Sequence, residues 1–211
     1  MTFLFSLIFL AIIFVCMAML IGDGLWSNLI AFVNVLFAAP LATTLFEPAA
    51  AWLDSMAPSF TYLIDILALW GIFAMAMIVL RLATNTVSRV RVRFHYLIDR
   101  IGGIVMALWT SWILVGFAMM TLHTAPLARN FMGGVFYASP EPVESQMFLG
   151  LAAPDRQWLA FVHMVSKPKW LGHGGGDPNT PTFDPQGEFI IKYAARRSAF
   201  ETEPSVRVQR D

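Results

Sequence analysis

The residue with the clearest chemical potential is Asp65, because it is an acid inside a long apolar segment. It is the only charged residue between positions 60 and 80. A carboxylate in hydrocarbon is costly, so its presence in a membrane span suggests ion or proton handling. However, Asp65 lies about 7.5 Å from the start of the segment, where it is within reach of water. We therefore expect a packing or interfacial role, with water or a hydroxyl such as Thr43 or Thr44 as partner.

Two asparagines, Asn28 and Asn34, lie in the preceding apolar segment, six residues apart. At this spacing they do not share a helix face closely. Amide side chains in membrane helices form hydrogen bonds between helices, and we expect that role here. In a transporter, the same two residues and Asp65 would instead line a path for the substrate.

Other kinds of chemistry lack their motifs. His173-Gly-Gly-Gly resembles an esterase oxyanion loop, but the chain has no Gly-x-Ser-x-Gly elbow. His163, His173 and Asp177 do not have the spacing of a metal-binding motif. The sequence contains no P-loop and no dinucleotide-binding glycine motif. It therefore predicts a non-enzymatic protein without catalytic residues, metal or cofactor.

The composition is that of a membrane protein. Hydrophobic residues make up 57% of the 211 residues and charged residues 13%, against about 25% charged in an average soluble domain. A helix of about 20 apolar residues crosses the hydrocarbon layer. The sequence predicts an all-α membrane protein, in which residues 1–122 form a bundle of about four transmembrane helices. These cover approximately residues 2–21, 25–45, 60–80 and 101–122.

The arginines predict how this domain lies in the membrane. All five basic residues of its sequence fall between positions 81 and 100, and cytoplasmic loops collect Lys and Arg. By alternation, the N-terminus, the polar connection 46–59 and the tail 123–211 are extracytoplasmic. No basic residue precedes the long first segment, which favours a retained helix over a cleaved signal peptide. The formal net charge is zero, which argues against a nucleic-acid partner.

The tail is polar and partly flexible, and it contains two short amphipathic helices. Pro154 is suited to open the first helix, and Pro168 to end it. Its apolar residues share one face: Trp158, Phe161, Val162 and Val165. Such a helix would lie on the membrane surface or cover the bundle. The second helix is expected over residues 188–200.

Small residues repeat at four-residue spacing in the last apolar segment, at Gly103, Ala107 and Ser111. This pattern predicts a ridge of small side chains that lets a neighbouring helix approach closely. Ridges of this kind indicate packing and not activity.

The same segment is introduced by Asp99-Arg100, and here the chain resembles the colicin V production (CvpA) family of bacterial inner-membrane proteins. That family has about four membrane helices. The last begins with Asp-Arg and carries glycines at four-residue spacing, as at Asp99, Arg100 and Gly103 here. Gly24 matches a glycine that the family places after its first helix. The resemblance covers roughly residues 1–125.

The chain departs from the family pattern at several positions. Ala107 stands where the family often has a second glycine, and Thr110 and Ser111 stand where it often has Arg-Gly. Ser27 and Asn28 replace residues that are often charged. Small size is kept at positions 107 and 111, but the charges are absent.

The resemblance implies a role in colicin V or toxin production or export, or in homeostasis of the cell envelope, at the bacterial inner membrane. The lipid bilayer and membrane or periplasmic proteins are the partners expected. Two alternatives stay open: a small transporter or channel subunit using Asp65, Asn28 and Asn34, and a membrane anchor for an extracytoplasmic partner. A transporter predicts that these polar residues meet in one cavity, whereas an anchor predicts a dry bundle and an ordered tail.

Overall fold

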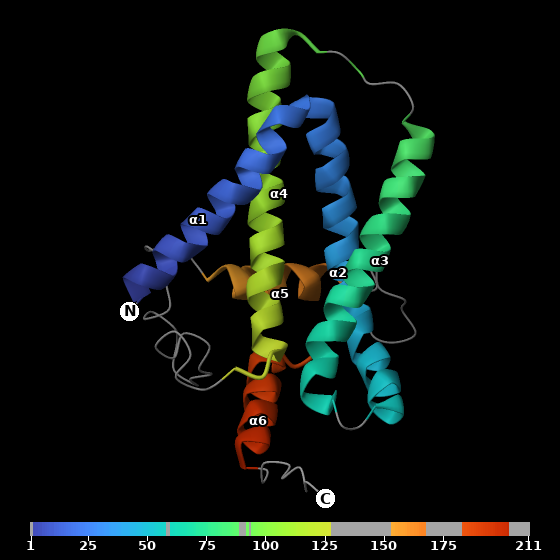
Figure 1. Ribbon diagram of the computed structural model, residues 1–211, viewed down its shortest axis with the longest axis vertical. Coiled ribbons are helices and arrows are strands. Elements are labelled where there is room, and N and C mark those ends of the chain that lie inside the picture. Colours follow the sequence, from blue (N-terminus) through green and yellow to red (C-terminus); the bar gives the residue numbers. More distant parts are fainter. Residues whose placement is uncertain are drawn as a thin grey trace, which may run out of the picture.

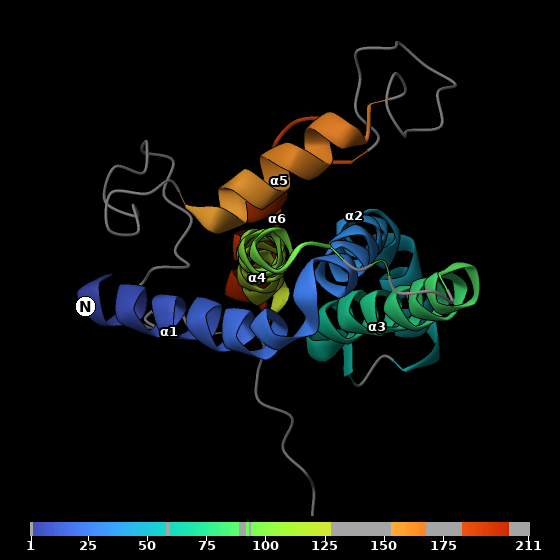
Figure 2. The ribbon, with the colours of Figure 1, turned by 90° about the horizontal axis from the view of Figure 1, so that it is seen from above.

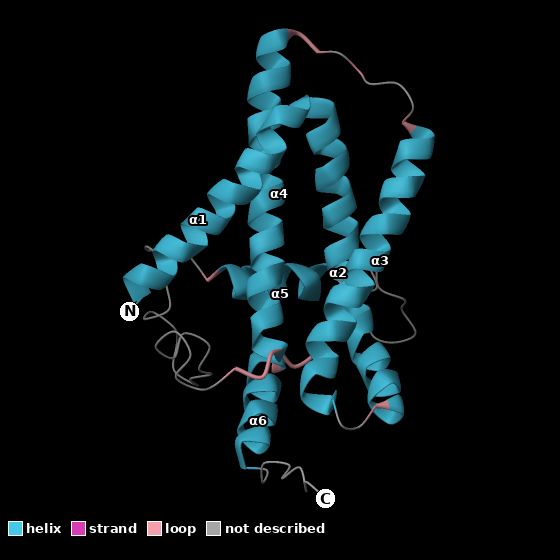
Figure 3. Ribbon diagram, in the orientation of Figure 1, coloured by secondary structure: helices cyan, strands magenta, loops and turns pink. Residues whose placement is uncertain are grey.

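A computed structural model describes residues 2–57, 60–88, 92, 94–127, 153–167 and 183–202, with the side chains of those between 10 and 199. Every regular element within these residues is a helix (Figure 3). In chain order they are α1 (Thr2–Leu20), the 3-10 turn η1 (Ile21–Asp23), α2 (Gly24–Met56), α3 (Thr61–Val87), α4 (Tyr96–Thr124), α5 (Pro154–Val165) and α6 (Phe189–Thr202) (Figure 1).

Three helical segments are long and apolar enough to cross a membrane: Leu10–Met56, Thr61–Val87 and Tyr96–Thr124. The first holds most of α1 and all of α2. Between them the chain reverses direction at η1, so that α1 and α2 form a hairpin (Figure 1). This confirms the predicted all-α membrane fold, with four long helices in the expected order.

The helices are longer than the apolar segments that predicted them. α2 continues through most of the connection 46–59 and ends at Met56, with Pro48 in its interior. The expected loop at this place was wrong because Phe46 and Ala50 are buried by the surrounding structure. Neighbouring packing of this kind lets membrane proteins keep a proline within a helix. α3 and α4 also extend past their apolar segments, toward the basic connection between them.

The bundle is arranged around α4. Viewed from above, α4 is central, α1 leaves it on one side, and α2 and α3 lie on the other (Figure 2). α2 packs against both α3 and α4, and α5 crosses α4 (Figures 1 and 2). We name the two ends of the bundle the Gly24 end and the Glu47 end, after residues found there.

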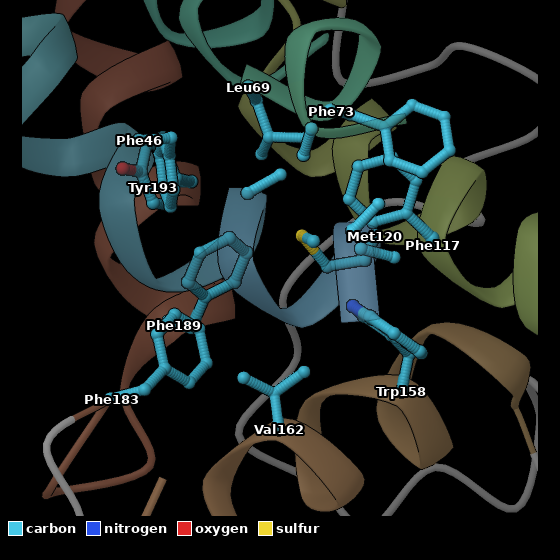
Figure 4. Close-up of a cluster of buried hydrophobic side chains, with 14 residues drawn as sticks. Phe46, Leu69, Phe73, Phe117, Met120, Trp158, Val162, Phe183, Phe189 and Tyr193 are labelled. Carbon is cyan, nitrogen blue, oxygen red and sulfur yellow. The ribbon is translucent and has the colours of Figure 1, made fainter. Parts of the chain in front are cut away.

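The largest apolar cluster joins the bundle to the two tail helices. Its large side chains from the bundle are Phe46, Leu69, Phe73, Phe117 and Met120, and those from the tail are Trp158, Val162, Phe183, Phe189 and Tyr193 (Figure 4). Burying this much apolar surface is a major favourable term in folding. α5 and α6 are therefore part of the packed structure, and α5 takes the second of its two expected positions, over the bundle.

Gly116 of α4 determines how closely α5 approaches. A Cβ atom at this position would lie 3.2 Å from the carbonyl oxygen of Pro154 and 3.6 Å from Cβ of Trp158. The glycine therefore leaves room for the first turn of α5 directly against α4. Trp158 and Val162, on the predicted apolar face, are buried there.

Candidate functional site

At the Gly24 end, the Asp-Arg motif of α4 meets the start of α2. The backbone N–H of Leu25 donates to Asp99 Oδ1 at 3.0 Å. A carboxylate at this place satisfies an otherwise unpaired amide and lies favourably in the helix dipole. Gly24 has a φ of +75°, and a Cβ atom on it would lie 2.9 Å from Asp99 Oδ2. Both the turn and the close approach thus require glycine.

Gly103 lies one helical turn beyond Asp99 and contacts the same backbone. A Cβ atom on Gly103 would lie 3.2 Å from the carbonyl carbon of Gly24. The rest of the predicted ridge, Ala107 and Ser111, is buried, and Ser111 Oγ donates to the carbonyl of Ala107 at 2.8 Å. The ridge is therefore a packed surface of α4, and at Gly103 it contacts the backbone at the start of α2. Arg100 is exposed and takes no part in this contact.

The two asparagines make the interhelical hydrogen bonds expected of them, but at separate places. Asn28 Nδ2 donates to the carbonyls of Leu20, at 2.9 Å, and Gly103, at 3.1 Å. Asn34 Nδ2 donates to Thr84 Oγ1 at 3.3 Å. Asn28 thus links α1, α2 and α4, whereas Asn34 links α2 to α3.

At the Glu47 end, Asp65 has a partner that we did not expect. Its side chain is 4% exposed, and Oδ2 lies 3.1 Å from Nη1 of Arg196 in α6. The prediction that Thr43 or Thr44 would be the partner of Asp65 was wrong. Their hydroxyls instead donate to carbonyls of their own helix. A hydroxyl cannot balance a buried carboxylate as a guanidinium does, which is why a cation from the tail occupies this position.

A second ion pair joins α6 to the bundle beside the first. Lys192 Nζ lies 2.7 Å from Glu47 Oε1, and the hydroxyl of Tyr193 donates to the same oxygen at 3.5 Å. Burial raises the pKa of Tyr193, and the negative charges of Asp65 and Glu47 raise it further. The phenol therefore stays protonated and serves as a donor.

Aromatic contacts complete the attachment of α6. The ring of Phe46 lies 6.2 Å from that of Phe189 and 6.0 Å from that of Tyr193, measured between centroids. Figure 4 shows Tyr193 alongside Phe46. Such edge and tilted arrangements are favourable for aromatic pairs. We call the surface formed by Phe46, Glu47 and Asp65 the α6 site.

α5 is held by two buried polar contacts. His123 Nε2, in the last turn of α4, lies 2.8 Å from Asp155 Oδ2, with side-chain exposures of 4% and 13%. Trp158 Nε1 donates to Thr43 Oγ1 at 3.3 Å. Burial raises the pKa of Asp155, but the hydrogen bond and charge of His123, with the backbone N–H of Arg156, outweigh it and hold that pKa below its ordinary value.

Two of the cavities formed by the described residues border the tail helices. One, of about 510 Å³, lies between α2 and residues 183–192; the other, of about 310 Å³, lies between α2, α4 and α5 and is mainly apolar. Asp65, Asn28 and Asn34 line neither of them.

No group of three or more His, Cys, Asp or Glu within the described residues could hold a metal ion. His173 and Asp177 lie outside these residues, as do three arginines of the basic connection: Arg89, Arg91 and Arg93.

Comparison with known protein families gives a match to the bundle. The model of the Colicin V production protein family matches residues 5–139. Among curated proteins and among solved structures, no match was found. The matched residues cover nearly all of α1 and the whole of α2, α3 and α4, including Gly24, Asp99 and Gly103, and they end before α5 begins. Because the match spans more than half of the 211 residues, the chain belongs to the colicin V production protein family.

Proposed function

We propose that this protein is a non-enzymatic inner-membrane component of colicin V or toxin production or export, or of envelope homeostasis. It acts by holding α5 and α6 against the extracytoplasmic end of its bundle. The observation that carries this proposal is the attachment of α6 through the ion pairs Asp65–Arg196 and Glu47–Lys192. The arginines between positions 81 and 100 support an orientation in which the Glu47 end is outside, because cytoplasmic loops collect Lys and Arg.

The contacts of the intramembrane polar residues favour this function over transport. A transporter would bring Asp65, Asn28 and Asn34 to one cavity. Instead each has a separate partner: a guanidinium for Asp65, backbone carbonyls for Asn28 and a threonine hydroxyl for Asn34. A packed bundle that carries ordered tail helices suits an anchor that presents a surface to other envelope proteins.

Complementation of a strain that lacks its own family member tests this function. Secreted colicin V is measured by growth inhibition of a sensitive strain. The variant Lys192→Gln/Arg196→Gln should insert normally but lose export, because both ion pairs of α6 are removed. The matched control Lys167→Gln removes a tail charge outside these contacts and should export normally. Full export by the double variant would contradict the proposal.

A further inference from the structure

We propose that the α6 site is a recognition site for a basic amphipathic helix of a partner polypeptide, and that α6 occupies it while the partner is absent. This inference rests on the proposed function, because it places the action of the protein at its tail-bearing end. Beyond that function, it specifies the chemistry of the partner and the residues of the α6 site that select the partner.

The α6 helix shows what the site selects. Its docking residues are Phe189, Lys192, Tyr193 and Arg196, at helical positions i, i+3, i+4 and i+7. This is the spacing by which an amphipathic helix binds in a groove. Each docking residue has a counterpart: both aromatic rings contact Phe46, and the two cations pair with Glu47 and Asp65 respectively.

The buried acid indicates that the site selects its ligand by charge. Replacing a buried ion pair by apolar residues is often neutral or stabilising, so attachment alone does not require a charged pair at this place. Asp65 is 4% exposed and Arg196 34% exposed. The carboxylate therefore belongs to the site itself, and the cation reaches it from outside. A helix with an apolar or acidic side chain at i+7 would leave this carboxylate buried without a counter-charge.

The contacts of α6 also permit exchange. The side chains of Lys192 and Glu47 are 54% and 45% exposed, so water can solvate both as they separate. The cavity of about 510 Å³ borders Phe189, Lys192 and Glu47, so there is open space beside the Lys192–Glu47 ion pair. Because α6 is tethered, its effective concentration at the site is on the order of mM. A competing helix at a much lower concentration is therefore excluded from the site.

The occupant we assign is a helical segment of an exported or extracytoplasmic polypeptide that carries this aromatic and basic pattern. A peptide of residues 183–202 has the pattern and serves as the probe. Its binding, with a fluorescent label, is measured by anisotropy to full-length chains in lipid nanodiscs. Three chains are compared: wild type, Lys192→Ala/Arg196→Gln, and the same double variant with Asp65→Asn added.

The double variant weakens its own α6 and should bind the peptide at least about 30-fold more tightly than wild type, because the tethered competitor is reduced. Adding Asp65→Asn should weaken binding about ten-fold relative to the double variant, because the arginine of the peptide loses its counter-charge and the chain's own α6 docks more strongly. Absence of binding to the double variant, or equal binding to all three chains, overturns the inference. Export is not part of this measurement, so the proposed function can fail while peptide binding persists.

Carbodiimide coupling of the wild-type chain gives a second measurement without any variant. Lys192 Nζ and Glu47 Oε1, 2.7 Å apart, should be joined within one chain. Peptide at a concentration on the order of mM should reduce this product and couple to Glu47 instead. An intrachain product that resists the peptide contradicts exchange. Coupling between two chains assigns the site to α6 of a second copy and overturns the proposed partner.

Discussion

Replacing Arg196 with glutamine leaves Asp65 as a buried carboxylate without its counter-charge. Breaking a fully buried ion pair in this way costs about 3–5 kcal/mol. Because the Arg196 side chain is 34% exposed, water replaces part of what the guanidinium supplies, and we expect a cost of about 2–3 kcal/mol. The cost falls on the attachment of α6, since the contacts among α1, α2, α3 and α4 do not include Arg196.

Hydrogen exchange measured by mass spectrometry reports this cost directly, because amides of α6 that are protected by docking exchange when it detaches. At about 1.4 kcal/mol for each factor of ten, they should exchange roughly 30- to 150-fold faster in Arg196→Gln, with α4 unchanged. The matched control is Lys192→Gln, in the same helix. Its ion pair is about half exposed and worth about 0–1 kcal/mol, so exchange should accelerate by less than about five-fold.

The double variant Asp65→Asn/Arg196→Gln separates a charge effect from a packing effect. It removes the uncompensated carboxylate, so α6 should exchange more slowly in it than in Arg196→Gln alone. An unchanged exchange rate of α6 in Arg196→Gln would refute the reasoning. So would a double variant whose change in α6 stability equals the sum of the changes in Asp65→Asn and Arg196→Gln.

Three other features give predictions that separate variants test. Gly103→Leu should lower the folded yield, measured by size-exclusion chromatography, because even its Cβ atom would lie 3.2 Å from the backbone of Gly24. The control Gly22→Leu should keep the normal yield, because nothing lies within 4 Å of a Cβ atom at that position. Equal yields for the two variants would contradict the close contact. A reporter fused after Leu122 should show alkaline phosphatase activity, and fluorescence from a cytoplasm-only reporter would reverse the orientation. The pKa of Asp155 is lowered from its ordinary value of 3.8 in the folded protein. The ionised carboxylate therefore stabilises α5 docking at pH values above 3.8, and this contribution is lost as the pH falls through the lower pKa of the folded state. Exchange in α5 should therefore accelerate in acid below about pH 4, and Asp155→Asn should abolish that acceleration if the reasoning holds.

Hydropathy predicted where the membrane helices lie, because an apolar segment of the right length has few other solutions in a bilayer. It did not predict where they end. Glu47, Pro48 and Asp54 suggested a loop, yet they lie within α2, since helix ends also depend on the burial of neighbours such as Phe46. That burial is supplied in part by tail helices distant in sequence, which local composition does not reveal.

The Gly24 end was more predictable than the Glu47 end. Gly24, Asp99 and Gly103 were all identified from the family resemblance, and they meet in space. The partner of Asp65 was not predicted because local composition does not show which residue of the distant tail contacts a given membrane helix. A signal was nevertheless present: Arg196 lies on a predicted amphipathic helix on the same side of the membrane as Asp65.

The capping of α2 by Asp99 has a consequence for biosynthesis. Asp99 follows Leu25 by 74 residues, so at about 5–20 residues per second the ribosome delivers it some 4–15 s after the amide that it caps. During that interval the first hairpin stays in the bilayer without its carboxylate cap. The last membrane helix thus completes the first hairpin, and a nascent chain that stops before position 99 lacks the carboxylate that caps the start of α2.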